Sequence, residues 1–511
     1  MDVGRLLDIG AFRYPDKMAV VCRDKRWTYR QLQERVRRLS SAFLHLGVKK
    51  GDRVGAVMWN CSEVVEIYLA AVRIGAIFTP LNFRFVLPEL KYVLSDASPS
   101  VLIVDEKCQD LAQGAVSDKR LFECLYSISS GNLGGLKPYR DLMEKSPPFD
   151  KSLPIAGSDP CSLLYTSGTT GKPKGVLLSH DNINWNSINM IQVRHDHPDD
   201  VALILGPMFH VGALNSHYSS RLAIGGTAVI MDKFDPTEMM ETIQRESITV
   251  VSGAPTMYIM LMEACKPGDY DTSSVHTLTS GADKFPLQTQ MAIREYFPKI
   301  EGVYDIYGMT EATCVTGLEA RDSIRKFGSV GPPLPFCEVK LLNDQEKEVA
   351  TGQIGEIVLR GPNVMMGYYN LPEETEKALK DGWYYSGDMG YADDEGFIYI
   401  ADRKKDIIIS GAENIIPKEV EEILYAHPDV LKVGVFGVPD AKWGERVVAA
   451  ILPRGGRIPT LEEIREHAKK HLAGYKIPRE IMIVDKLPEA SVGKVQKQKL
   501  RKMYEERLQE K

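Results

Sequence analysis

Residues 165–175, Tyr-Thr-Ser-Gly-Thr-Thr-Gly-Lys-Pro-Lys-Gly, restrict the possible folds more than any other part of the chain. They contain four serine and threonine hydroxyls, three glycines and two lysines. Glycines let the backbone approach a ligand closely, and successive exposed N–H groups form a concave anion site. The apolar flanks, 161–165 and 176–179, are typical of short strands. This pattern predicts a phosphate-binding loop that joins two strands at the end of a sheet.

Two other interpretations of this loop are weaker. A Walker A loop has four residues between its glycines and then Gly-Lys-Ser/Thr. Here two residues separate Gly168 from Gly171, and Pro173 follows Lys172, which disfavours a P-loop NTPase. A polar surface turn is the simpler alternative, but turns need neither this density of hydroxyls nor paired lysines.

The first 150 residues alternate between apolar strand patterns and helical patterns. Thr28 to Gln31 has the form of a capping box, followed by apolar residues at helical spacing. Buried strands are expected at 54–58, 77–81 and 101–104, with helices at 63–73 and 87–94. Strands that alternate with helices predict an α/β fold in which a largely parallel sheet is covered on both faces.

Length and composition limit the remaining possibilities. At 511 residues the chain exceeds the usual size of a single core, so at least two domains are expected. The net charge of −6 disfavours nucleic acid or an anionic membrane as the main partner. The apolar stretch 64–81 is interrupted by Glu66, Arg73 and Pro80, so no transmembrane segment is expected. The N-terminus lacks a signal-peptide pattern and the eight cysteines include no CxxC pair, which favours the cytoplasm.

The second half of the chain changes character twice. Residues 328–367 are rich in glycine, proline and short β-type runs, which predicts a small antiparallel barrel or sheet. The charged run 402–406 is typical of a solvated linker. After it, a helix at 417–425, strands at 431–437 and 447–453, and a helix at 461–472 predict a small α+β domain.

Residues 166–175 resemble the signature of the adenylate-forming superfamily, which comprises acyl-CoA synthetases, beetle luciferases and peptide-synthetase adenylation domains. The resemblance extends over nearly the whole chain. It implies a large N-terminal domain of two α/β sheet subdomains plus a small β-barrel, followed by a small mobile α+β C-terminal lid domain. The implied boundaries are 1–402 for the AMP- and acyl-binding domain, 403–405 for a hinge with Lys405 as its pivot, and 406–511 for the lid.

The motif 305–311, Asp-Ile-Tyr-Gly-Met-Thr-Glu, supplies groups suited to a nucleotide. An aromatic ring can stack on a purine, a hydroxyl can bind phosphate, and a carboxylate can hold Mg²⁺ beside the phosphates. By resemblance Glu311 is the metal ligand, Asp388 binds the ribose, and Lys494 enters the site to bridge carboxylate and phosphate. The catalytic residues so implied are Lys494, Thr310, Glu311 and His210. The implied ATP- and AMP-binding residues are Thr166, Ser167, Gly168, Thr169, Thr170, Gly171, Lys172, Lys174, Gly281, Ala282, Asp305, Tyr307, Asp388 and Arg403.

The acyl pocket is expected near a histidine in 207–212. A lone histidine beside apolar residues is more often a core residue, but the resemblance places His210 at the carboxylate end of the pocket. It would orient the acid without removing a proton, because a carboxylate is already ionised at neutral pH. Acetyl-CoA synthetases carry tryptophan at the position of Gly308, so glycine here suggests a longer tunnel, unless it serves only the backbone turn. The implied pocket residues are His210, Val211, Asn215, Gly253, Gly308 and Met309.

The expected CoA contacts are Gly411, Ala412, Trp443 and Tyr475. Gly411 and Ala412 lie in a loop, 410–414, that resembles the pantetheine-binding loop. The stretch 474–477 departs from some relatives, because it has Ile477 where an arginine could bind the CoA nucleotide. Trp443 and Tyr475 are candidates for stacking.

These parts predict an ATP-dependent carboxylic acid:CoA ligase that forms acyl-AMP and then acyl-CoA, with ATP, CoA and Mg²⁺ as cofactors. A medium- or long-chain fatty acid is favoured, partly because 402–406 resembles the hinge of fatty acyl ligases. An aryl or arylpropenoic acid of the benzoate or coumarate type is the alternative, and luciferase-like oxygen chemistry stays open. A catalytically silent nucleotide sensor is the alternative from another class, although such a protein would be expected to lose Glu311 or Lys494. The expected partners are small molecules only, with a homodimer possible because relatives are often dimers.

Overall fold

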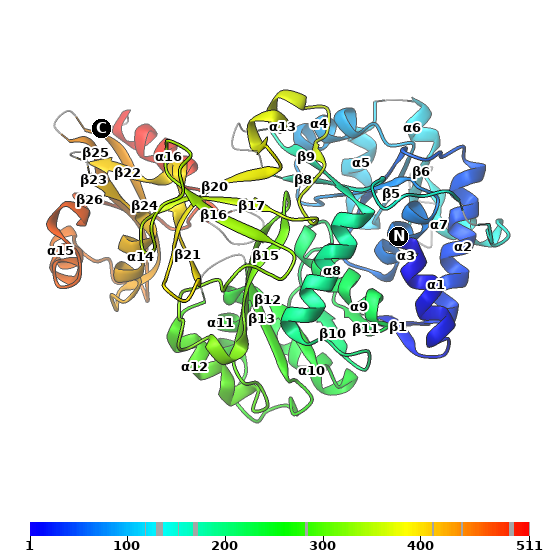
Figure 1. Ribbon diagram of the computed structural model, residues 1–511, viewed down its shortest axis with the longest axis horizontal. Coiled ribbons are helices and arrows are strands. Elements are labelled where there is room, and N and C mark those ends of the chain that lie inside the picture. Colours follow the sequence, from blue (N-terminus) through cyan, green and yellow to red (C-terminus); the bar gives the residue numbers. More distant parts are fainter. Residues whose placement is uncertain are drawn as a thin grey trace. The chain divides into compact units, whose positions relative to one another are not determined.

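The computed structural model describes residues 1–117, 119–128, 136–151, 153–166, 172–281, 285–410, 413–440, 443–489 and 495–509. The chain divides into two compact units (Figure 1). The N-terminal unit contains Met1–Glu338 and Leu359–Tyr384, and the C-terminal unit contains Val339–Val358 and Tyr385–Lys511. No helix among the described residues is both long enough and apolar enough to cross a membrane.

Two eight-stranded sheets form the framework of the N-terminal unit, as predicted. The first has the order β15-β14-β13-β12-β10-β11-β1-β2 and is parallel from β14 to β1. The strands β2 and β15 are antiparallel edges. Its strands are β1 Met18–Cys22, β2 Lys25–Thr28, β10 Val201–Ile204, β11 Thr227–Ile230, β12 Val250–Gly253, β13 Thr277–Gly281, β14 Val303–Met309 and β15 Thr313–Leu318.

The second sheet has the order β18-β9-β8-β4-β3-β5-β6-β7. It is parallel from β8 to β7, whereas β9 is antiparallel to β8 and β18 is antiparallel to β9. Its strands are β3 Arg53–Val57, β4 Ile77–Leu81, β5 Val101–Val104, β6 Leu125–Ser127, β7 Lys137–Pro138, β8 Pro160–Thr166, β9 Lys174–Ser179 and β18 Gly367–Tyr368. The predicted strands at 54–58, 77–81 and 101–104 are confirmed as β3, β4 and β5.

Helices connect and cover these sheets (Figure 1). The predicted capping box is present, since Thr28 accepts from the Gln31 amide and Gln31 accepts from that of Thr28. The helices are α1 Gly4–Arg13, α2 Tyr29–His45, α3 Ser62–Arg73, α4 Leu87–Ala97, α5 Gln109–Ala115, α6 Lys119–Glu123, α7 Tyr139–Glu144, α8 His180–Arg194, α9 Ser219–Ile224, α10 Pro236–Glu246, α11 Pro255–Ala264, α12 Leu287–Tyr296 and α13 Pro372–Ala378, with a π-helix η2 at Gly212–Tyr218 and 3₁₀ turns η1 Glu106–Cys108 and η3 Ala320–Asp322.

Each sheet has its own apolar core. One core includes Leu203, Val251 and Leu278 of the first sheet, and another includes Val57, Leu102 and Leu163 of the second. Strand β5 is buried at every position, which is why its sequence is a continuous apolar run with no alternation. Burial on both faces fixes the strands rigidly, so the loops at their carboxyl ends have defined positions.

The predicted barrel or sheet at 328–367 contributes β16 and β17 to a five-stranded sheet, whose other three strands lie at 379–403. Its order is β16-β17-β20-β19, and β21 pairs with β20. The strands are β16 Glu338–Leu342, β17 Gly355–Arg360, β19 Leu379–Lys380, β20 Trp383–Ala392 and β21 Ile398–Arg403. Asp388 therefore lies inside a strand, because β20 continues four residues beyond it.

The last hundred residues form the expected α+β arrangement. The sheet order is β23-β22-β25-β24, with β26 paired to β25. The elements are η4 Lys404–Asp406, β22 Ile408–Ser410, β23 Glu413–Ile415, α14 Pro417–Tyr425, β24 Val430–Asp440, β25 Gly444–Pro453, α15 Leu461–Lys469, η5 Gly474–Lys476, β26 Glu480–Ile483 and α16 Lys497–Gln509. Two apolar clusters, around Val435 and Val448, fill the two faces of this sheet.

The interpretation of 402–406 as a solvated run is wrong for its two carboxylates. Asp402 is 4% exposed and Asp406 8% exposed. The Lys497 ammonium lies 2.9 Å from Asp402 Oδ2 and 3.3 Å from Glu421 Oε1. Asp402 can be buried because the Lys497 ammonium, far along the sequence, compensates its negative charge, as a buried ion requires.

Candidate active site

Several predicted site residues lie at the carboxyl ends of adjacent parallel strands of the first sheet. Gly253 ends β12, Gly281 ends β13, and Tyr307, Gly308 and Met309 end β14. In the strand register, Gly253 lies opposite Ser280 and Gly281 lies opposite Ile306. Ligands of open α/β sheets bind beyond this edge. The fold thus brings together residues that the sequence separates by more than fifty positions.

The phosphate loop joins two antiparallel strands, as predicted. Thr166 at the end of β8 lies opposite Lys174 at the start of β9. Thr166 donates to the Lys174 carbonyl at 3.5 Å, which closes the base of the loop. The loop residues Ser167, Gly168, Thr169, Thr170 and Gly171 lie outside the described residues.

The two loop lysines already have partners. Lys172 Nζ lies 5.4 Å from the centre of the Tyr92 ring. Lys174 Nζ lies 2.5 Å from Glu374 Oε2 and 5.1 Å from the centre of the Tyr368 ring. The pKa of Glu374 falls to about 2 because Lys174 and Lys377 stabilise its charged form. Sequence reasoning missed Glu374, since nothing marked it as a partner of a residue 200 positions earlier.

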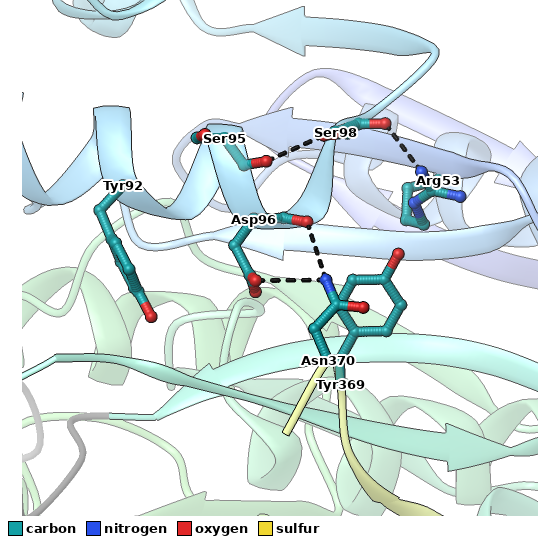
Figure 2. A pocket seen from close by; sticks show the side chains of 7 residues that line it. All are labelled: Arg53, Tyr92, Ser95, Asp96, Ser98, Tyr369 and Asn370. Carbon is teal, nitrogen blue, oxygen red and sulfur yellow. Dashed lines mark hydrogen bonds between the residues drawn. The ribbon is translucent and has the colours of Figure 1, made fainter. Parts of the chain in front are cut away.

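A polar pocket of about 450 Å³ adjoins the base of the loop (Figure 2). The Tyr165 hydroxyl, one residue before Thr166, donates to Asp96 Oδ2 at 2.6 Å, and the Asn370 amide donates to Asp96 Oδ1 at 3.3 Å. Arg53 donates to the Ser98 carbonyl at 3.0 Å. The Tyr165 contact with Asp96 ties the end of β8 to α4.

Glu311 lies in the turn between β14 and β15. The Tyr368 hydroxyl donates to Glu311 Oε1 at 3.0 Å. Burial and the charge of Glu311 raise the pKa of Tyr368, so the phenol stays protonated and remains a donor at neutral pH. Tyr368, on β18, is a second partner that the sequence did not reveal. The carboxylate is thereby oriented from one side.

This carboxylate fits the way Mg²⁺ is commonly held in ATP-dependent enzymes. Mg²⁺ is usually bound by one or two carboxylates together with substrate phosphates. Over the described ranges, no group of three or more His, Cys, Asp or Glu side chains forms a complete metal cage. The single carboxylate of Glu311, oriented by Tyr368, is compatible with this mode of binding.

His210 follows β10 in a tight turn. The centre of its ring lies 4.3 Å from the centre of the Phe209 ring. The Phe209 ring in turn packs edge-on against the Phe83 ring, with 5.3 Å between their centres. Burial, and secondarily the charge of Arg84, lower the pKa of His210 to about 4. The imidazole is therefore neutral at pH 7. A neutral imidazole has one N–H donor, so it can orient a carboxylate but does not supply a charge to it.

The titration of His210 leads to a testable expectation. Its folded pKa of about 4 lies below the unfolded value of 6.5, so the unfolded chain binds more protons between these pH values. Stability is lost as the pH falls through this window, and His210→Asn should reduce that loss. Above about pH 6 the imidazole is uncharged in the folded protein, so the variant should lower adenylation by the same factor at pH 6 and pH 8. If the rate of adenylation by the wild type fell below about pH 6.5, and this fall disappeared in His210→Asn, the neutral state of the imidazole at pH 6 would be contradicted.

The segment after His210 forms the π-helix η2, which carries Asn215. Such helices are rare and often occur at functional sites, and no sequence pattern indicated this one. Asn215 is completely buried, and neither polar atom of its side chain has a hydrogen-bond partner among the described residues. Buried amides almost always have partners, so this side chain has capacity for a polar contact. Val211 directly precedes the π-helix.

Gly308 has a backbone explanation of its own. A Cβ at this position would lie 1.8 Å from the Thr313 carbonyl oxygen, so the hairpin between β14 and β15 requires glycine here. The longer acyl tunnel inferred from Gly308 stays a prediction, and the glycine alone no longer supports it.

The C-terminal unit holds the remaining candidates. Asp388 on β20 lies opposite Arg403 on β21 and is 5% exposed. Tyr475 lies in η5 and is 39% exposed, and Lys405 lies in η4. Gly411, Ala412 and Lys494, together with Ala282 of the N-terminal unit, lie outside the described residues.

Trp443 has a cationic neighbour. The Arg479 guanidinium lies 4.9 Å from the centre of the Trp443 ring. Arg479 lies two residues after Ile477, and only the folded chain shows its contact with Trp443.

Comparison with known families gives two matches. The family model described as AMP-binding enzyme matches residues 7–369. The model described as AMP-binding enzyme C-terminal domain matches residues 419–494. Together they cover most of both units.

Curated relatives match over nearly their full length. Feruloyl-CoA synthase of Amycolatopsis sp is 38% identical over 93% of this chain and 94% of its own. Indoleacetate–CoA ligase of Aromatoleum aromaticum is 36% identical over 98% of both chains. Long-chain-fatty-acid–CoA ligase of Bacillus subtilis is 34% identical over 97% of this chain and 93% of its own.

Solved structures agree with these relatives. ATP-bound MatB from Rhodopseudomonas palustris superposes with a TM-score of 0.90 at 31% identity, over 99% of both chains. The o-succinylbenzoate CoA synthetase of Bacillus subtilis, in complex with its acyl-adenylate intermediate, superposes with a TM-score of 0.85 at 30% identity, over 97% of this chain and 98% of its own.

Proposed function

The chain belongs to the family of AMP-binding enzymes, and we propose that the carboxylic acid it activates carries an aromatic ring. The protein is an AMP-forming acid–thiol ligase, an acyl-CoA synthetase of the adenylate-forming superfamily. ATP and CoA are its other substrates. The identity of the acid is the part that needs inference.

The observation that carries the aromatic assignment is the pair of relatives named for feruloyl and indoleacetate substrates, at 38% and 36% identity. Both acids combine a ring with a polar group. The buried Asn215 amide supports such a substrate, since a polar atom on the acid would give it a partner. A medium- or long-chain fatty acid is the second candidate substrate. The relative named as a long-chain-fatty-acid–CoA ligase, at 34% identity, supports it.

In the first half-reaction the acid's carboxylate attacks the α-phosphorus of ATP. A C–O–P bond forms, the bond to pyrophosphate breaks, and no protein nucleophile is needed. Catalysis consists of positioning and charge neutralisation. His210 orients the carboxylate, Thr166, Lys172 and Lys174 bind the phosphates, and Tyr307 stacks on adenine.

Two further residues control the positive charge near the phosphates. Glu311, oriented by Tyr368, would hold Mg²⁺, which supplies positive charge to the phosphates when bound. Lys494 bridges the carboxylate and the phosphate. Lys174 must exchange Glu374 for a phosphate oxygen when ATP enters, because its ammonium is already paired.

In the second half-reaction the CoA thiol loses its proton to solvent, attacks the acyl carbonyl, and AMP leaves. We assign the domains as 1–402 and 406–511, with the lid turning about Lys405 to withdraw Lys494 and present Gly411 to pantetheine. Trp443 with Arg479 and Tyr475 are candidates for the CoA nucleotide. A cytoplasmic location and a homodimer complete the proposal.

A pyrophosphate-release screen over graded acids tests the substrate class. Ferulate, coumarate and indoleacetate should exceed octanoate and palmitate by about tenfold in kcat/KM, because a mismatched apolar pocket costs about 1–3 kcal/mol. Acetate and a reaction without acid serve as controls. A preference of the same size for the fatty acids would reject the aromatic assignment and leave the ligase activity intact.

A further inference from the structure

We propose that Asn363 is a positioning residue that holds the Glu311 turn in a strained conformation, and thereby sets the affinity for MgATP. The inference rests on the proposed role of Glu311 as the metal carboxylate. Asn363 lies between β17 and β18, some fifty residues after the turn in sequence, and is completely buried.

The side-chain amide nitrogen of Asn363 contacts the residues that follow Glu311. Its amide nitrogen lies 2.6 Å from the Ala312 carbonyl, 2.9 Å from the Cys314 carbonyl and 3.2 Å from Thr313 Oγ1. Its carbonyl oxygen accepts from the Cys337 thiol at 3.2 Å. An amide has two N–H donors, so both are used on three consecutive residues after Glu311.

Those contacts surround a strained backbone. Thr313 has φ of +50°, in the left-handed region that β-branched residues rarely adopt. Its carbonyl oxygen occupies the space where a side chain at position 308 would lie. Strain of this kind persists only when neighbouring groups over-determine it, and it is concentrated at functional sites.

The same short segment also holds Glu311 directly. The Met365 amide donates to the Glu311 carbonyl at 2.8 Å, and the Tyr368 hydroxyl donates to its carboxylate at 3.0 Å. Asn363, Met365 and Tyr368 thus fix the turn on both sides of the carboxylate. Without Asn363, Thr313 can relax to negative φ and carry Glu311 away from Tyr368.

Asn189 on α8 provides a matched control. It is also completely buried and donates to Cys337 Sγ at 3.4 Å. Its side chain forms no hydrogen bond with residues 311–314 in the part of the chain that the structure describes. Replacing it removes a buried asparagine from the same network and leaves the turn alone.

The test is the dissociation constant, by calorimetry, of MgATP and of AMP, which binds without the metal. Asn363→Ala should raise the dissociation constant of MgATP about tenfold, equivalent to about 1.4 kcal/mol of binding free energy. The dissociation constant of AMP should stay within about twofold of the wild-type value. Asn189→Ala should change neither. Adding Thr313→Gly to Asn363→Ala should restore most of the MgATP affinity, because glycine adopts positive φ without strain.

Equal weakening of MgATP and AMP in Asn363→Ala, or no recovery in the double variant, would overturn the inference. If Asn363→Ala does not fold, Asn363→Ser keeps one donor and should give the same order with about a threefold loss. Glu311→Gln separates the two claims. An unchanged MgATP affinity there would overturn the role of Glu311 and this inference with it, whereas a loss there without a loss in the Asn363 variants would overturn this inference alone.

Discussion

Glu311→Gln should lower acid-dependent ATP–pyrophosphate exchange by about a hundredfold or more. A cation about 4 Å from a phosphate charge contributes roughly 4 kcal/mol at an effective dielectric near 20, against about 1 kcal/mol for a neutral hydrogen bond. Glutamine keeps the size of the side chain and can still accept from Tyr368, but it is a poor ligand for Mg²⁺. The loss should therefore appear in the rate of adenylation and not in folding.

Glu319→Gln is the control for Glu311→Gln, because Glu319 is a partly exposed carboxylate just after β15. It should retain wild-type exchange. Wild-type exchange in Glu311→Gln itself would exclude this carboxylate from phosphate stabilisation.

Lys494→Ala should suppress the first half-reaction and spare the second. Removing one preorganised donor from a reacting centre costs about a hundredfold to a thousandfold, so pyrophosphate exchange should fall by that factor. Formation of the thioester from supplied acyl-AMP should stay within about twofold, because a lid turned about Lys405 has withdrawn Lys494 by then. The two assays are run on the same preparation.

Lys486→Ala, which removes an exposed lysine of the same unit, should affect neither half-reaction. Equal losses in both assays for Lys494→Ala would argue against an alternating lid and in favour of a general role of the lysine in stability.

The sequence predicted the framework well where local patterns decide the structure. Strands β3, β4 and β5 were recognisable because burial on both faces leaves a mostly apolar run, although Arg53 begins β3 and β4 contains Thr79. The start of α2 was recognisable because a capping box is a local motif. Strands β8 and β9 were predicted for the same reason, since both lie within twenty residues of sequence, and the phosphate-binding role of the loop between them stays a prediction.

Features that depend on distant pairs were missed. Lys174 forms an ion pair with Glu374, and the Asn363 side chain donates to the Ala312 carbonyl. No periodic pattern in the sequence connects residues that lie so far apart along the chain. Asp402 in the run 402–406 was wrongly expected to be solvated, because the cation that compensates its charge lies on α16, at Lys497.

Gly308 illustrates a different limit. Family resemblance suggested an open pocket, whereas the contact with the Thr313 carbonyl depends on strand register that the sequence does not specify.

The most direct test of the account omits CoA. With ATP, Mg²⁺ and ferulate alone, the enzyme should catalyse ferulate-dependent pyrophosphate exchange and accumulate feruloyl-AMP in amounts stoichiometric with the chain. Adding CoA should then convert the adenylate to AMP and the thioester. An active preparation that forms its thioester with release of ADP, or that makes no adenylate from any acid it uses until CoA is present, would contradict the two-step mechanism.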